Sequence, residues 1–160
     1  MLFTSKSIVS HRQRGSTLVE ILVAVTIIAL VLTAVSAMIS MSVKLAENNE
    51  KKQLALQKAE EALEFFRKER SISSWNSFSN SLTDEAIYCV SAFPEQIASL
   101  SAQLGACGDE DTMEAARYSF KRQVEVNFDG SDRLSVEIEM LWNDGTKAKN
   151  LLLEQAFENY

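Results

Sequence analysis

Hydrophobic residues follow three distinct patterns along the chain, and the first is an uninterrupted apolar run. From Ile21 to Val43 there are 23 residues without a charged side chain. A helix rises about 1.5 Å per residue, so this run spans about 34 Å, enough to cross a hydrocarbon core of about 30 Å with some tilt. The run therefore predicts a membrane-spanning helix.

The second pattern has the period of an amphipathic helix. Leu56, Ala59, Leu63 and Phe66 recur three or four residues apart, which places them on one helix face. Charged residues occupy the opposite face, as expected for a face in contact with water, and no Pro or Gly interrupts the segment. We therefore expect residues 44–70 to continue the same helix and to pack through this apolar stripe.

The third pattern alternates apolar and polar side chains, as in strands with one buried face. It begins at Arg117, where only Arg122 interrupts the apolar series, and it continues through Asp129-Gly130 and Asp144-Gly145 turns. The third strand places three apolar residues on one face: Leu151, Leu153 and Phe157. Short turns favour antiparallel pairing, so we expect residues 117–157 to form a β-meander that packs one face against the helix. The expected fold class is α+β.

Between the helix and the sheet the pattern is weaker. The Ser-rich composition of residues 71–81 predicts a loop, and we expect Trp75 and Phe78 in this loop to pack against the domain. Residues 87–90 predict a short strand, and Pro94 can open a short helix. The apolar face of that helix would comprise Ile97, Leu100 and Leu104.

Charges around the apolar run are asymmetric. Lys6, Arg12 and Arg14 precede the run without any acid, and acids after it begin again at Glu47, so the positive-inside rule places Met1 in the cytoplasm and the rest of the chain outside. In an exported domain, the two cysteines most simply form one disulfide, worth about 3 kcal/mol for a loop of this length. These are Cys89 and Cys107, and two unrelated buried thiols are the alternative.

One acid stands at the start of the apolar run. Glu20 could be an interfacial residue that extends to the lipid headgroups, but its setting has a known parallel. The segment Arg14 to Glu20, followed by the apolar run, resembles the class III leader of type IV pilins and type II secretion pseudopilins. The resemblance implies cleavage by a prepilin peptidase between Gly15 and Ser16, N-methylation of the new Ser16 amine, and an assembly role for Glu20. In that role, the Glu20 carboxylate neutralises the N-terminal amine of a neighbouring subunit.

Two departures from the major pilins narrow the resemblance. The residue after the cut is Ser16 rather than Phe, and the apolar helix contains no Pro. Both features are typical of minor pilins and pseudopilins, so we expect a structural subunit of a pilus or pseudopilus. The implied partners are other pilin or pseudopilin subunits, the prepilin peptidase, the inner-membrane assembly platform and membrane lipid.

The same resemblance sets the domain organisation and the location. We expect a cleaved leader over residues 1–15, the membrane half of the helix over 16–43, its amphipathic half over 44–70 and an extracytoplasmic domain over 71–160. The protein would be a single-pass inner-membrane protein before it joins a pilus or pseudopilus. Whether that filament serves motility, secretion or DNA uptake stays open.

Residue chemistry disfavours an enzyme. The one histidine, His11, lies in the predicted leader, so the mature chain has no imidazole for a nucleophile–base pair or a zinc site, and the scattered glycines form no phosphate loop. Asp109–Asp111 do not have the spacing of a calcium loop, and Glu137 and Glu139 read as the water-facing side of a strand. We expect no cofactor and no metal.

The net charge limits the possible partners of the chain, and two other interpretations of its function stay open. The full chain has a formal net charge of -6, and loss of the basic leader residues leaves it more acidic, so general nucleic-acid binding is not expected. A secreted protein could instead be cut by a signal peptidase near Val35-Ser36-Ala37. A third reading is an enzyme or binding domain that keeps its membrane anchor.

Overall fold

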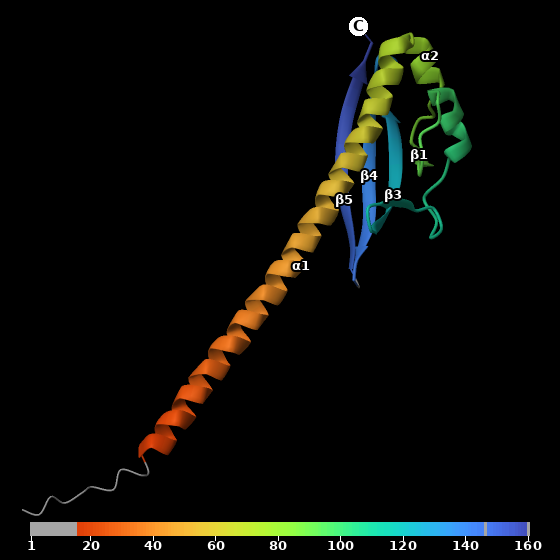
Figure 1. The fold of residues 1–160 in the computed structure, drawn as a ribbon. Coiled ribbons are helices and arrows are strands. Elements are labelled where there is room, and N and C mark those ends of the chain that lie inside the picture. Colours follow the sequence, from red (N-terminus) through yellow and green to blue (C-terminus); the bar gives the residue numbers. More distant parts are fainter. Residues whose placement is uncertain (1–15, 146, 160) are drawn as a thin grey trace, which may run out of the picture. The chain divides into compact units, whose positions relative to one another are not determined.

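The computed structural model describes residues 16–145 and 147–159 (Figure 1). It divides into two compact units whose boundary falls between Leu45 and Ala46. Helix α1, Ser16–Ile72, contributes to both units. The structure confirms the α+β class, with a long N-terminal helix whose second half packs on an antiparallel sheet.

The sheet extends beyond the predicted meander. Three long strands form the meander in all-antiparallel register: β3 (Tyr118–Phe128), β4 (Arg133–Asp144) and β5 (Lys147–Glu158). Gly130 and Gly145 lie in the two connecting turns with φ of 76° and 65°, a conformation that glycine adopts without strain. Two short strands cover the far side of β3: β1 (Ala86–Cys89) and β2 (Met113–Ala115). Strand β1 confirms the short strand that the sequence predicts, and β2 lacks a sequence signal.

The core lies between α1 and one face of the sheet. Along α1, Ala55, Ala59, Ala62 and Phe66 are fully buried and Leu63 nearly so, facing the inward side chains of β3 and β4. Three alanines in the stripe let the helix backbone approach the sheet closely, because alanine has only a β-carbon. The sheet residues of the core include Val124, Val126, Val136, Ile138 and Met140.

Leu56 departs from the predicted apolar stripe. Its side chain is 39% exposed, whereas its neighbour Ala55 is fully buried. Successive helix residues are rotated by about 100°, so a face centred on Ala55, Ala59 and Ala62 turns Leu56 toward the margin of the interface. Leu56 there borders β5 near Leu151.

The predicted loop over residues 71–81 is wrong in part, because residues Trp75–Asn80 form helix α2. Ser74 explains the helix: its side-chain oxygen accepts a hydrogen bond from the Ser77 backbone N–H at 3.3 Å, as an N-cap does. The prediction that Trp75 and Phe78 are buried is confirmed. Trp75 Nε1 also donates to the Ser131 carbonyl at 2.8 Å.

The short helix expected after Pro94 is a 3₁₀ helix, η1, over Ile97–Gln103. Pro94 lies before the helix rather than in its first turn. Ile97 and Leu100 are buried as predicted, but Leu104 is 52% exposed. A 3₁₀ helix has three residues per turn, so Ile97 and Leu100 lie on the same face. Leu104 follows Leu100 by four residues, a spacing that suits an α-helix, and it therefore lies off this face.

Candidate functional site

The region expected to be processed lies at the start of α1. Gly15 and His11 lie outside the described residues, and α1 begins at Ser16. Glu20 follows within the first turns of the helix, with an exposed side chain. It is the only charged residue from Ser16 to Val43. The structure therefore presents one carboxylate near the start of an otherwise uncharged helix.

Within residues 16–145 and 147–159, the apolar side chains that follow Glu20 are not buried by other parts of the protein. All large apolar residues from Leu18 to Val43 are between 46% and 77% exposed. The most hydrophobic window of this helix has a mean hydropathy of 2.8, and none of it is buried inside the protein. The helix is long and apolar enough to cross a bilayer, where lipid would cover this surface.

Four of the five hydroxyl groups within the apolar run are satisfied by the helix itself. Thr26 and Thr33 donate to carbonyls three residues earlier, those of Val23 and Leu30, at 2.8 and 2.9 Å. Ser36 and Ser40 donate four residues back in the same way, at 2.8 and 3.0 Å. An unpaired hydroxyl in hydrocarbon is costly, so this internal bonding makes the segment compatible with a lipid environment.

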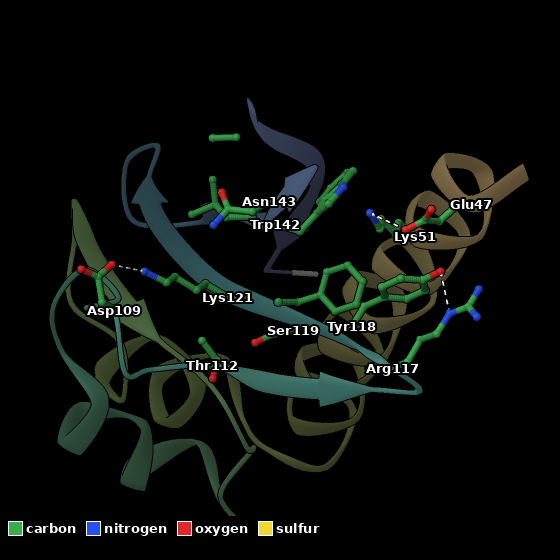
Figure 2. Close-up of a pocket in the computed structure, with 13 residues that line it drawn as sticks. Glu47, Lys51, Asp109, Thr112, Arg117, Tyr118, Ser119, Lys121, Trp142 and Asn143 are labelled. Atoms are coloured by element: carbon green, nitrogen blue, oxygen red, sulfur yellow. Dashed lines mark hydrogen bonds and ion pairs between the residues drawn. The ribbon is translucent and has the colours of Figure 1, made fainter. Parts of the chain in front are cut away.

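A cleft of about 570 Å³ is lined by residues of α1, β3, β4 and β5 and of the segment before β2 (Figure 2). At its α1 side lies Lys51, which is buried and forms ion pairs with Glu47 at 3.1 Å and Asp144 at 3.2 Å. The hydrogen bond to Glu47 raises the pKa of Lys51 against the opposing effect of burial. The Lys51 ammonium also lies 5.2 Å from the centre of the Tyr118 ring.

The other cations of the cleft are also paired. Arg117 contacts the Glu50 carboxylate at 2.7 Å, and the hydrogen bond from Arg117 to the Tyr118 hydroxyl, together with Glu50, raises the pKa of Arg117. Lys121 bonds Asp109 at 2.9 Å, which lowers the pKa of Asp109 (Figure 2). With a carboxylate on each of its cations, the cleft offers no open site for an anion. The pairs of Lys51 with Asp144 and of Arg117 with Glu50 instead connect α1 to β4 and to the start of β3.

The acidic segment Asp109–Asp111 is likewise engaged within the protein. Asp109 pairs with Lys121, and Asp111 accepts a hydrogen bond from the Gly108 backbone N–H at 2.8 Å. Over the part of the chain that the structure describes, no group of three or more His, Cys, Asp or Glu side chains could hold a metal ion. The segment therefore makes one local turn contact and one ion pair to β3.

A protein-family model matches the region around the start of α1. Residues 10–36 match the model of the prokaryotic N-terminal methylation motif. The chain carries a class III prepilin leader. No curated protein and no solved structure matches the chain at a significant level. The motif supports the type IV pilin and pseudopilin family, and it includes Gly15, Ser16 and Glu20.

The prepilin leader gives the features of α1 a common explanation. The matched residues contain the basic residues Arg12 and Arg14, followed by Glu20 and the start of the apolar run. The leader together with the apolar helix suggests a single-pass anchor in the inner membrane that later enters a filament. Families defined by the pilin-type N-methylation motif are structural rather than enzymatic.

In the domain that follows α1, the structure joins Cys89 and Cys107 in a disulfide with a Cα–Cα distance of 4.9 Å. The bond closes a loop that contains η1. The Gly105 backbone N–H donates to the Ile87 carbonyl at 2.8 Å beside it, and Cys107 N–H donates to the Gln123 side chain at 3.0 Å. The segment after η1 is thereby held on β1 and β3.

Arg122 points into the domain, in register with its apolar neighbours. It is 3% exposed, and its guanidinium donates to the Val90 carbonyl at 2.9 Å and the Lys58 carbonyl at 3.0 Å. The guanidinium carbon lies 4.1 Å from the centre of the Phe93 ring. Burial lowers the pKa of Arg122 to about 10, so the group stays charged at neutral pH. This residue links α1, the segment after β1 and β3.

Glu137 and Glu139 lie on the outer face of the sheet, as expected. The register adds a feature that the sequence does not reveal: Glu125, Glu137 and Glu154 stand directly opposite one another on three adjacent strands. Partial burial, and then the neighbouring carboxylates of Glu125 and Glu154, raise the pKa of Glu137. Like charges in this arrangement oppose folding.

Sequence reasoning missed the cluster around Lys51. A weak signal exists, since Glu47 and Lys51 are four residues apart with the acid first, the favourable orientation on a helix. The contact with Asp144 joins residues 93 positions apart, and no local pattern encodes it.

Proposed function

We propose that this chain is a minor pilin or type II secretion pseudopilin, a structural subunit that primes or joins a filament. The N-terminal methylation motif over residues 10–36 is the observation that carries the proposal. The long helix, exposed over its first part and packed on an antiparallel sheet over its second, supports it. The departures at Ser16 and in the Pro-free helix favour the minor-pilin or pseudopilin class over a major pilin.

Processing would prepare the N-terminus for assembly. A prepilin peptidase would cut between Gly15 and Ser16 and methylate the Ser16 amine, removing the basic leader that holds the N-terminus at the cytoplasmic face. The new amine is a cation at the start of an apolar helix. In a lipid environment an unpaired charge of this kind is expensive.

Glu20 would supply the opposite charge. An exposed carboxylate near the start of the same helix is also expensive in lipid, so each group gains from pairing with the other group on a neighbouring subunit. Neutralisation then requires a defined axial register between subunits. Glu20 thus acts as an assembly residue, and other pilin subunits are its partners.

The remaining roles belong to other proteins. The described part of the chain has no histidine, no phosphate-binding glycine loop and no metal cluster, so it provides no means of driving its own extraction from the bilayer. The inner-membrane assembly platform would provide the force. The domain over residues 71–160 would lie on the extracytoplasmic side, as the basic flank of the helix indicates.

The N-terminal mass of the mature protein tests the processing step. The protein is isolated from cells with and without the prepilin peptidase. We expect a chain that begins at methylated Ser16 only when the peptidase is present. A start near Met38 would indicate a secreted protein, and an intact Met1 in both strains would indicate a retained anchor; either result overturns the proposal.

Glu20→Gln tests the assembly step separately from processing. The variant should still be cleaved and methylated, but its incorporation into sheared filaments should fall because the Ser16 amine loses its counter-charge. Glu64→Gln is the matched control, since Glu64 is an exposed glutamate farther along α1. Equal incorporation of both variants would exclude the charge-pairing role of Glu20.

We also propose that the Cys89–Cys107 disulfide forms in the exported domain. Both sulfurs should resist alkylation in the folded and the unfolded protein until a reductant is added. Alkylation of the unfolded, unreduced protein at either cysteine would contradict the pairing.

A further inference from the structure

Strand β5 ends the sheet with one edge uncovered. The strand order is β1-β3-β4-β5, and the opposite side of the sheet is closed by β1 and β2 along β3, whereas β5 pairs only with β4 (Figure 1). Its register with β4 runs without a bulge from Lys147 to Glu158, and it contains no Pro. Long, regular edge strands are templates for pairing with another chain, and proteins usually protect them.

Helix α1 protects only one end of this edge. Arg70 donates to the Glu158 carbonyl at 3.1 Å. Gln155 donates to the Ala156 carbonyl at 3.2 Å, and Arg67 holds the Gln155 side chain at 2.7 Å. These bonds cap two carbonyls at the C-terminal end of β5.

The same two bonds identify which backbone groups face outward. The carbonyls of Ala156 and Glu158 are free to accept from side chains because they point away from β4, and backbone groups alternate along a strand. The N–H and C=O groups of four further residues therefore face the open edge: Ala148, Asn150, Leu152 and Glu154. Within residues 16–145 and 147–159, no hydrogen bond to these outward groups is found.

Exposed apolar side chains flank this open segment on both faces of the sheet. On the helix side, a hollow of about 300 Å³ is lined by Leu56 and Leu151 together with polar residues of α1. On the outer face, Leu152 is 52% exposed. A strand added here would bury apolar side chains on each of its two faces.

The charges along the open edge indicate which charged side chains an added strand would carry. Lys147 and Lys149 lie at its beginning, and Glu154 lies at its end beside Glu137. A complementary strand would place carboxylates opposite the two lysines, apolar residues opposite Leu151 to Leu153, and a base opposite Glu154.

We infer that residues 148–154 of β5 bind an extended segment of another protein chain, which adds to the sheet as a strand with this acid–apolar–base pattern. Main-chain hydrogen bonds supply affinity, and the hollow beside Leu56 supplies specificity. The inference concerns the domain alone and goes beyond the proposed filament role.

A designed peptide tests the pairing directly. The sequence Thr-Lys-Val-Ile-Val-Thr-Glu-Thr-Glu, bound antiparallel, places Lys opposite Glu154, Ile opposite Leu152 and the two Glu opposite Lys149 and Lys147. Binding of the fluorescent peptide to the full chain in detergent is followed by anisotropy. We expect saturable binding, and its absence up to millimolar peptide would overturn the inference.

N-methylated forms of the peptide separate backbone pairing from simple apolar contact. Methylation of the Ile nitrogen and of the following Thr nitrogen removes N–H groups that face β5, and should weaken binding by about tenfold or more. Methylation of the two Val nitrogens removes N–H groups that face away, and should leave binding nearly unchanged. Equal effects of the two forms would contradict strand addition.

Variants of the protein locate the site. Leu152→Lys places a charge on the open edge, as natural edge strands do, and should weaken peptide binding by about tenfold or more. Leu104→Lys is the matched control, because Leu104 is also 52% exposed but lies outside β5. Thermal unfolding of both variants establishes that they fold. Equal peptide affinities of the two variants would place the binding elsewhere.

A second copy of this chain is the competing occupant. Sedimentation of the full chain without peptide distinguishes it. A monomer that binds peptide supports a different protein as the partner. Self-association that Leu152→Lys abolishes and Leu104→Lys does not would show that the edge pairs with itself, and would overturn the partner assigned here.

Discussion

The two halves of α1 belong to one helix but meet different surroundings. From Leu18 to Val43 every large apolar side chain is exposed on the protein, and no face is preferred. From Ala55 to Phe66 the buried positions recur at helical spacing and are mostly alanine. The first half is uniformly apolar, whereas the second is apolar on one side only.

This difference shows that burial, rather than helix formation, distinguishes the two segments. The second half needs one narrow face that fits a sheet, so small residues alternate with charged ones. The first half needs a surface that is apolar in every direction and hydroxyls that bond to their own helix, as a lipid environment demands. Substitutions that have opposite effects in the two halves can test this contrast.

The largest effect is expected from loss of a buried aromatic ring in the second half. Phe66→Ala should lower the free energy of unfolding of the domain by about 3–5 kcal/mol, because Phe66 is fully buried and its removal leaves a cavity. Leu30→Ala, at a position 70% exposed, should leave that free energy unchanged. Denaturant unfolding in detergent, followed by tryptophan fluorescence, measures both. Similar losses would refute the separation between the halves.

A charge introduced into the first half of α1 should have a larger effect than the same charge in the second half. This order is the reverse of the one expected for the two alanine substitutions. Leu30→Arg should make membrane insertion less favourable by about 2.5–3.5 kcal/mol, the cost of a charge near the centre of a span. Leu56→Arg adds the same charge at an exposed position of the second half and should not change insertion. Alkaline extraction of membranes reports the inserted fraction. If Leu56→Arg were extracted as readily as Leu30→Arg, the membrane boundary assigned to α1 would be wrong.

Substitution of Arg122 tests how much its hydrogen bonds stabilise the packing of the second half of α1 on the sheet. Arg122→Met keeps the aliphatic stem but leaves the Val90 and Lys58 carbonyls without their charged donor, so stability should fall by about 1.5–3 kcal/mol. Arg133→Met is the control, since Arg133 is exposed and its contact with Glu158 is 3.9 Å. Chemical unfolding of the two variants should differ clearly. Equal midpoints would show that the buried guanidinium adds nothing to the packing of α1.

The smallest effect concerns the outer face of the sheet, opposite to α1. Glu137→Gln should stabilise the domain at pH 7 by about 0.2–1 kcal/mol, because it removes one of three carboxylates that stand opposite one another. The pKa of Glu137 is raised in the folded state, so the folded protein holds this proton more tightly than the unfolded chain does. Stability should therefore fall as pH rises from the ordinary glutamate pKa through the raised one.

Melting temperatures of both proteins measured across this pH range test the sign. The wild type should lose stability with rising pH relative to Glu137→Gln, and the difference should disappear at acid pH, where Glu137 is protonated in both states. Glu60→Gln, at an exposed site on α1, should show no such difference. A constant offset between wild type and Glu137→Gln would exclude repulsion as the cause.

Sequence determined the features that depend on composition and local period. The apolar run, the amphipathic continuation of the helix and the alternating strands each carry a signal within a few neighbouring residues, and the motif at Gly15, Ser16 and Glu20 is local as well. The exceptions were also local but finer: the Ser74 cap of α2 and the 3₁₀ period that leaves Leu104 outside the core.

Tertiary structure decided which of these pieces meet. Lys51 and Asp144, Arg122 and the Lys58 carbonyl, and the row of Glu125, Glu137 and Glu154 join residues that lie far apart in the chain or on separate strands. Their contacts follow from strand register and from the face that α1 turns toward the sheet. A local pattern sets which residues share a face, but only the packed structure sets what that face touches.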